Sequence, residues 1–364
     1  MIVQQLTLEN FRNYKTLKLG LSPSLNVLIG RNGSGKTNFV EAIHYLSNAR
    51  SWRTTDQSIL IREGCAETLI EGKIEVGELS KEVSISLSKG SKKISINGKA
   101  AKNVSELSKL VNVLLFTPSD VPLFMTSPSK RRSFLDEALC KSSITYQDEL
   151  RSYNKLLTER NNVLKDENVD LGVLEVLTSQ IASVALKIAK ERDSYIKATN
   201  EILPNILKEL LGDVNGKIVY KPFVNTSSSL EEVKALYEKS KDKDLVLKST
   251  SIGPHREDFA FILNEKDLGD YASQGQNRMA VLSLKLSPYF LAKSEEKPIV
   301  VLDDVSSELD EDNLNRLKKF VTKLDQVFIT ATKLEIEAAS NIEVATNNAV
   351  RRNTLFVACD RSSA

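Results

Sequence analysis

The stretch Gly30-Arg31-Asn32-Gly33-Ser34-Gly35-Lys36-Thr37 decides how this sequence is interpreted. It fits the pattern G-x-x-x-x-G-K-T, which is a phosphate-binding loop when it follows a strand and opens a helix. Both flanking segments fit this requirement. Residues 26–29 predict a short buried strand, and residues 37–47 carry apolar side chains at helical spacing. We therefore expect ATP and Mg²⁺ as ligands. All eight residues would bind the nucleotide, with Lys36 on the terminal phosphates, where it also serves catalysis, and the Thr37 hydroxyl on the metal.

A pair of carboxylates forms the second half of the expected site. Asp303 and Asp304 follow the apolar run 299–302, and a carboxylate at the end of such a strand holds Mg²⁺ in P-loop ATPases. We assign Mg²⁺ binding to Asp303 and Thr37. Asp304 is the candidate catalytic residue, because a carboxylate near the terminal phosphate can orient or deprotonate water. The alternative for Asp304 is a charge or cap at a helix N-terminus.

The hydrophobic pattern indicates an α/β protein. Period-two alternation over 69–96, with a turn at Asn97-Gly98, predicts a small antiparallel β subdomain. Apolar stripes over 146–164 and 174–195 predict an antiparallel helical hairpin, and the runs 299–302 and 326–329 predict buried parallel strands. We expect segment 1–127 to hold the P-loop and the β subdomain, segment 128–243 to form an inserted helical arm, and segment 244–364 to complete the split ATPase domain.

Composition narrows the classes of protein to which the chain can belong. Lys+Arg 50 against Asp+Glu 48 gives a net charge of +2, so a DNA site would have to be a local patch. Three scattered cysteines and two histidines offer neither a disulfide framework nor zinc-ligand spacing. Without a signal-like N-terminus or a stretch judged apolar enough to cross a bilayer, we expect a cytoplasmic protein and no membrane partner.

A third motif gives the P-loop a more specific meaning. Ser273-Gln274-Gly275-Gln276 opens an expected helix, and Ser306–Asp310 follows the paired carboxylates. Taken alone, a plain helix cap would explain Ser273. With the P-loop and Asp303 in this order, however, the set resembles the Walker A, signature, Walker B and D-loop of ABC-type ATPase heads. That resemblance implies nucleotide contacts from the four signature residues and from Asp310, and it places Ser273 against the ATP of a second copy.

Within this class the chain resembles the RecF family, whose heads are similar to those of SMC proteins. The resemblance rests on four stretches: Phe11–Tyr14, Lys130–Asp136, Gly253–Arg256 and Leu302–Asp310. It implies ATP-dependent binding of double-stranded DNA near single-strand gaps or stalled replication. It also implies an ATP-dependent homodimer, work with RecR and RecO in loading RecA, and support of the SOS response.

Departures from the ABC pattern predict slow hydrolysis that resets a switch. Gln274 stands where many heads have glycine, Thr330-Ala331-Thr332 stands where a histidine is usual, and Asp304 replaces the more usual glutamate. No glutamine marks a Q-loop near 116–120. The alternatives are a small-molecule kinase, another ABC-type ATPase that does not act on DNA, and a GTPase suggested by Thr322–Asp325.

Two basic clusters are the candidates for DNA phosphate, namely Lys130-Arg131-Arg132 and Arg50-Ser51-Trp52-Arg53. The alternative for each is a solvated face or a set of internal ion pairs. A last strand is expected at 355–357.

Overall fold

The computed structural model describes residues 1–293, 297–307, 309–336, 339–345 and 348–351. The expected strand at 355–357 lies outside these ranges. The chain forms two compact units, one made of Met1–Asp120 with Ala292–Ala364 and the other of Val121–Leu291. Their limits differ from those of the three segments expected from the sequence, and that division stays a prediction.

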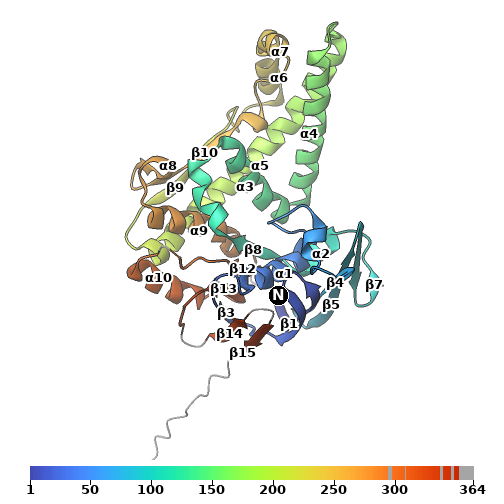
Figure 1. Cartoon of the computed structure of the whole chain (residues 1–364). Coiled ribbons are helices and arrows are strands. Elements are labelled where there is room, and N and C mark those ends of the chain that lie inside the picture. The colour runs from blue at the N-terminus through green and yellow to red at the C-terminus, as the bar shows by residue number, and fades with distance from the viewer. Residues whose placement is uncertain (294–296, 308, 337–338, 346–347, 352–364) are drawn as a thin grey trace, which may run out of the picture. The chain divides into compact units, whose positions relative to one another are not determined.

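The first unit contains a mostly parallel sheet with the strand order β15-β14-β3-β13-β12-β8 (Figure 1). The strands are β3 (Leu25–Ile29), β8 (Val113–Phe116), β12 (Ile299–Leu302), β13 (Val327–Ala331), β14 (Ser340–Ala345) and β15 (Asn348–Arg351). Only β15 pairs antiparallel with its neighbour. The predicted parallel strands are thus confirmed. The carboxyl ends of five strands meet at one edge, where open α/β sheets bind their ligands.

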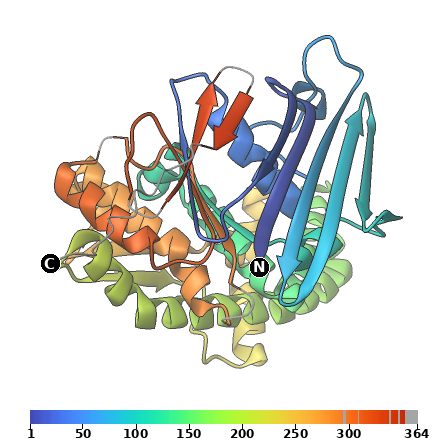
Figure 2. The same cartoon turned by 90° about the horizontal axis from the view of Figure 1, so that it is seen from below.

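The second sheet of this unit is antiparallel, with the order β2-β1-β4-β5-β6-β7 (Figure 2, blue and cyan). Its strands are β1 (Ile2–Phe11), β2 (Tyr14–Gly20), β4 (Glu67–Val76), β5 (Leu79–Ser88), β6 (Ser91–Ile96) and β7 (Lys99–Ala100). The alternation over 69–96 correctly predicted β4 to β6. It did not predict that β1 and β2 extend the same sheet.

One apolar core joins both sheets to helix α1 (Lys36–Asn48), the helix that the P-loop opens. Phe39, Ile43 and Leu46 of α1 are fully buried in this core. At Gly72 of β4, an added Cβ would lie 2.6 Å from the Leu46 side chain, so α1 packs where the sheet offers glycine. The unit also contains α2 (Ser105–Leu110), α10 (Glu311–Val321) and the 3₁₀ turn η1 (Gln57–Leu60).

The second unit is mainly helical, and its predicted hairpin is confirmed by α4 (Ile144–Lys165) and α5 (Leu171–Leu211), which pack on each other. Helix α5 extends well past residue 195, where the apolar stripe was expected to end. The other helices are α3 (Pro128–Ser142), α6 (Leu230–Lys239), α7 (Lys241–Leu247), α8 (Leu268–Tyr271) and α9 (Gln274–Leu291), with 3₁₀ turns η2 (Pro118–Met125, which begins in the first unit) and η3 (Pro254–Arg256). A small sheet has the order β11-β10-β9, from Lys266–Asp267, Asp258–Leu263 and Gly216–Lys221.

Buried ion pairs explain why the polar residue Arg160 interrupts the apolar stripe over 146–164. Arg160 is fully buried, and its guanidinium donates to Asp244 at 2.8 Å and to Thr250 at 2.7 Å. In α5, Arg192 is 2% exposed and pairs with Asp136 at 2.7 Å and with Glu257 at 2.5 Å. Such pairs do little for net stability, but breaking one costs about 3–5 kcal/mol because a charge is left buried alone.

Helix α5 is long and apolar enough to cross a bilayer, judged by length and composition only. The expectation that no stretch would meet this criterion was therefore wrong. The apolar residues of α5 have another use here, since Leu174, Ile181 and Ile188 are buried and the helix packs against α4, α6, α9 and β9.

Candidate functional site

The phosphate-binding loop lies between β3 and α1, as the sequence predicted. Gly33 and Gly35 have φ of 77° and 114°. These positive values are costly for residues that carry a Cβ. At Gly30, a Cβ would lie 2.2 Å from the Val344 carbonyl oxygen. The glycines of the motif are therefore required by backbone geometry and by close packing.

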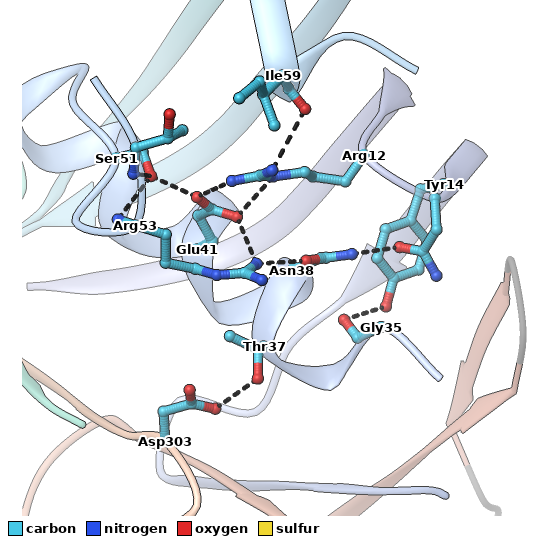
Figure 3. Close-up of polar contacts among 12 residues, drawn as sticks. Arg12, Tyr14, Gly35, Thr37, Asn38, Glu41, Ser51, Arg53, Ile59 and Asp303 are labelled. Atoms are coloured by element: carbon cyan, nitrogen blue, oxygen red, sulfur yellow. Dashed lines mark hydrogen bonds and ion pairs between the residues drawn. The ribbon is translucent and has the colours of Figure 1, made fainter. Parts of the chain in front are cut away.

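Residues of the first hairpin fix the shape of this loop. The side-chain amide of Asn13 donates to the Ser34 carbonyl at 3.1 Å. The Tyr14 hydroxyl donates to the Gly35 carbonyl at 3.1 Å (Figure 3). Asn38 of α1 in turn donates to Asn13 at 2.8 Å. These bonds hold the loop in one conformation, which lowers the ordering cost of binding an anion.

The ammonium of Lys36 lies across the loop. It donates to the carbonyl oxygens of Gly30 at 2.7 Å and Arg31 at 2.9 Å. Burial lowers the pKa of Lys36, while Asp304 and Asp303 act in the opposite direction. The hydroxyl oxygen of Ser34 is buried and has no hydrogen-bond partner within the described chain. A buried hydroxyl without a partner, a lysine and a helix N-terminus together are suited to binding a polyphosphate.

The two halves of the predicted metal site meet. The Thr37 hydroxyl donates to Oδ1 of Asp303 at 3.1 Å (Figure 3), and the Asp303 N–H donates to the Phe116 carbonyl of the neighbouring strand at 2.9 Å. Burial raises the pKa of Asp303, opposed by its hydrogen bonds to Thr330 and Thr37. Within the described ranges no three histidine, cysteine or acidic side chains gather into a metal cage. One hydroxyl and one carboxylate suit Mg²⁺, which usually takes its other ligands from phosphate and water.

Asp304 lies directly after this site in a strained conformation. It is exposed, and its φ of 49° belongs to the left-handed region, which non-glycine residues adopt at a cost of about 1–3 kcal/mol. Its backbone N–H donates to the Thr330 hydroxyl at 2.8 Å, and this bond supports the turn. Such strain clusters at functional sites, although it assigns no role to the side chain.

Thr330 is the site residue that the sequence analysis missed. Its hydroxyl donates to Asp303 at 2.7 Å from inside β13, in the segment where ABC-type heads usually have a histidine. A polar residue that directly follows the apolar run 327–329 was the available signal.

A buried carboxylate connects the loop helix to two arginines. Glu41 of α1 is fully buried and accepts from Arg12 at 2.7 and 2.9 Å and from Arg53 at 3.1 Å (Figure 3). Ser51 donates to the same carboxylate at 2.5 Å. Arg53 was a candidate for DNA phosphate, but here it belongs to an internal ion pair.

A hollow of about 730 Å³ opens beside this cluster. Its lining includes the side chains of Arg12, Asn13, Asn38, Arg53 and Arg62. The hollow is therefore polar and basic, and Asn13 and Asn38 also belong to the network that holds the P-loop.

The second unit contains the signature segment. Ser273 precedes α9 and forms a reciprocal cap with Gln276, in which the Gln276 N–H donates to the Ser273 hydroxyl at 3.2 Å and the Ser273 N–H donates to the Gln276 side chain at 3.1 Å. Gln274 and Gly275 lie in the first turn. The plain helix cap considered from the sequence is thus present. A nucleotide contact by these four residues stays a prediction.

The D-loop segment is described in part. Asp310 caps α10 by accepting from the Asn313 N–H at 2.7 Å. Residue 308 of the expected D-loop lies outside the described ranges. The nucleotide contact expected from Asp310 likewise stays a prediction.

The other basic cluster is also engaged internally. Arg131 forms a forked pair with Asp258 at 2.7 and 2.8 Å, and Arg132 donates to the Glu257 carbonyl at 2.8 Å. For these two arginines, the alternative of internal contacts is the one found.

Comparisons with known proteins agree on one family. Residues 2–352 match the family model described as RecF/RecN/SMC N terminal domain. The chain is 37% identical over 350 residues to the "DNA replication and repair protein RecF" of Lachnoclostridium phytofermentans, covering 94% of this chain and 96% of the relative. It is 38% identical over 346 residues to the protein of the same name from Clostridium botulinum strain Okra, covering 92% and 93%.

Solved structures give the same result. The recombination mediator protein RecF with ATP, described as part of the RecFOR pathway, matches with a TM-score of 0.83 at 31% identity, covering 96% of this chain and 97% of that one. An Smc head domain from Pyrococcus furiosus matches with a TM-score of 0.60 at 14% identity, covering 96% of both chains, and supports the fold alone.

Proposed function

Since this chain belongs to the RecF family, we propose that it is an ATP-dependent double-stranded DNA-binding protein of DNA replication and recombinational repair. The ABC-type head expected from the sequence agrees with its RecF and SMC relatives. The observation that carries the proposal is the contact between Thr37 and Asp303. It joins the P-loop to the carboxylate that follows β12, at the edge of the sheet where such folds bind their ligands.

The residues of the first unit divide the work on ATP. Residues 30–37 bind the phosphates, Thr37 and Asp303 hold Mg²⁺, and the basic hollow beside Asn38 receives the nucleoside. When bound, Mg²⁺ would neutralise the negative charge of the phosphates. Asp304 orients or deprotonates the attacking water, and Lys36 stabilises the charge that develops on the terminal phosphate.

ATP acts as a switch in this proposal. Ser273, Gln274, Gly275, Gln276 and Asp310 complete the nucleotide site of a second copy, so ATP stabilises a homodimer through its higher affinity for that state. Slow, DNA-dependent hydrolysis then releases the pair.

The biological role that we propose is inferred from the RecF relatives. RecF structures are described in the RecFOR pathway, and the RecF relatives are named for replication and repair. We propose that this protein works in the cytoplasm at gapped or stalled-replication DNA, near junctions of single and double strands. There it acts with RecR and RecO to help load RecA and to support the SOS response.

The test is the molecular mass in solution, measured with and without ATP and with a gapped duplex. We expect a monomer without ATP, a dimer with ATP, and a dimer bound to the duplex when both are present. A small-molecule kinase would ignore the DNA. A mass that changes with neither ATP nor the gapped duplex would rule out the proposed switch.

A further inference from the structure

Asn277 is a buried polar residue in the first turn of α9, directly after the signature segment. Its side chain is 1% exposed, and the next buried residues of the helix, Met279 to Leu282, are apolar. The side-chain amide of Asn277 donates to the carbonyl oxygen of Val121 at 2.7 Å, and both residues belong to the second unit. This bond attaches the start of α9 to the chain at Val121.

Asn277 also holds the signature serine. Its backbone N–H donates to the Ser273 carbonyl at 2.8 Å, and Ser273 and Gln276 cap each other in the same turn. Two hydrogen bonds of one residue therefore connect Ser273 to Val121. Because hydrogen-bonded turns are stiff, a shift of Val121 would move Ser273 with it.

Val121 is the residue at which the second unit begins, and the chain before it leads directly to the metal carboxylate. Asp303 donates its N–H to the carbonyl of Phe116, the last residue of β8, at 2.9 Å. The next residues form a braced turn. The N–H and the hydroxyl of Thr117 donate to the Asp120 carboxylate at 2.8 and 3.1 Å, and the Asp120 N–H donates back to the Thr117 carbonyl at 3.0 Å. Hydrogen bonds and this turn thus form a continuous path from Asp303 to Val121.

An unpaired acceptor argues that Asn277 does more than pack α9. The amide oxygen of Asn277 is buried and has no hydrogen-bond partner among the described residues. A buried polar atom without a partner carries the full cost of its lost hydration, so packing alone does not explain an amide that is paired at one end. Asn200 of α5 offers the contrast. Its amide uses both ends on the backbone of Ile218 in β9, at 2.8 and 2.7 Å, which is sufficient for a structural role.

We propose that Asn277 is a positioning residue, which sets Ser273 according to the state of the nucleotide site in the same copy. The inference rests on the proposed function, since it concerns the serine that completes the ATP site of a second copy. A shift of Asp303 on ATP binding reaches Asn277 along the path described above. A copy that holds its own ATP therefore presents Ser273 correctly to its partner, so that occupancy of the two sites is linked.

The experiment compares two variants of Asn277 with a matched control. Asn277→Ala removes the amide, and Asn277→Leu removes it while keeping most of its volume. Asn200→Ala is the control, because it removes an amide that bonds to the backbone in the same unit. For each protein we would measure urea unfolding, the ATP affinity of the monomer at low protein concentration, and the dissociation constant of the dimer at saturating ATP.

We expect both Asn277 variants to bind ATP within about twofold of the wild type and to form the ATP dimer about tenfold more weakly, the effect of one lost hydrogen bond. Asn200→Ala should keep the wild-type dimer even where it unfolds at lower urea.

Wild-type dimer formation by either Asn277 variant, or an equal loss in Asn200→Ala, would overturn the role of Asn277 while leaving the ATP dimer itself intact. Loss of ATP affinity together with the dimer would also overturn it, because general damage would then explain both. A wild-type protein that stays monomeric with ATP would overturn the proposed function.

Discussion

The hydroxyl of Thr330 in β13 donates a 2.7 Å hydrogen bond to Oδ1 of Asp303, the residue that directly follows the neighbouring parallel strand β12. The same hydroxyl accepts from the Asp304 N–H. Thr330 thus holds both Asp303, to which we assign Mg²⁺ binding, and Asp304, to which we assign the attacking water. A threonine makes these contacts in the segment where ABC-type heads usually have a histidine.

Replacing Thr330 with valine keeps its shape and removes the hydroxyl. We expect the free energy of unfolding to fall by about 1–3 kcal/mol, because the Asp304 N–H loses its acceptor and Asp303 loses a buried donor. ATP hydrolysis should fall with it. Urea unfolding and a phosphate-release assay measure the two effects, and Thr330→Ser is the control that keeps the hydroxyl. Equal hydrolysis by the valine and serine variants would mean that this hydroxyl does not orient the site.

Asp304→Asn tests the assigned catalytic residue. The amide keeps the size of the side chain and loses its basicity, so ATP should bind normally while hydrolysis is nearly abolished. Nucleotide titration and single-turnover hydrolysis give the two numbers. Wild-type turnover would return Asp304 to a structural role in the strained turn.

How far the sequence predicted this molecule depends on how local each signal is. The P-loop was predictable from eight adjacent residues, because Gly33 and Gly35 are required by the backbone geometry of the loop itself. The packing of Gly30 against the distant Val344 was not predictable. The Thr37–Asp303 contact joins residues far apart in the chain, and it was predictable because parallel strands end at one edge of a sheet.

Pairings between distant side chains were not predictable. Arg131 and Arg53 looked like DNA contacts because their carboxylate partners, Asp258 and Glu41, lie elsewhere in the chain.

Glu41→Ala should be among the most destabilising single changes in the first unit. It leaves the guanidinium of Arg12 facing that of Arg53 without their shared carboxylate, and removing one partner of a buried pair costs about 3–5 kcal/mol. Glu137→Ala is the control, since Glu137 forms a partly exposed pair with Lys141 that should be worth at most about 1 kcal/mol. Chemical denaturation of both variants makes the comparison. Similar losses would show that the Glu41 cluster contributes no more than a surface pair.

His255 should make stability depend on pH. Its Nε2 lies 3.0 Å from the Thr250 carbonyl, which can only accept, so Nε2 carries the hydrogen and Nδ1 accepts from the Tyr153 hydroxyl at 2.6 Å. Burial lowers the pKa of His255 to about 4, below its ordinary 6.5. The folded state therefore holds neutral histidine, and its stabilising contribution, complete above pH 6.5, is lost as the pH falls toward 4.

From these pKa values, we expect the loss of stability between pH 7.5 and pH 5.5 to be on the order of 1 kcal/mol. Denaturation of the wild type and of His255→Gln at both pH values isolates this contribution from that of the carboxylates. The variant should lose less stability than the wild type by that amount. Parallel losses in the two proteins would show that His255 does not titrate in this window.

In the proposed switch, ATP joins two copies of the protein through a site completed by Ser273 of the second copy. Ser273→Arg adds bulk and charge at the start of α9 and leaves the P-loop sequence unchanged. We predict near-normal ATP affinity in the monomer, with dimer formation, hydrolysis and stable DNA binding lost together. Mixing this variant with Lys36→Arg should restore one composite site.

Sedimentation velocity of the Ser273→Arg protein with ATP tests the shared site. We predict that the wild-type protein sediments as a dimer and the variant as a monomer at the same ATP saturation. A variant that forms dimers as well as the wild type would contradict the shared site.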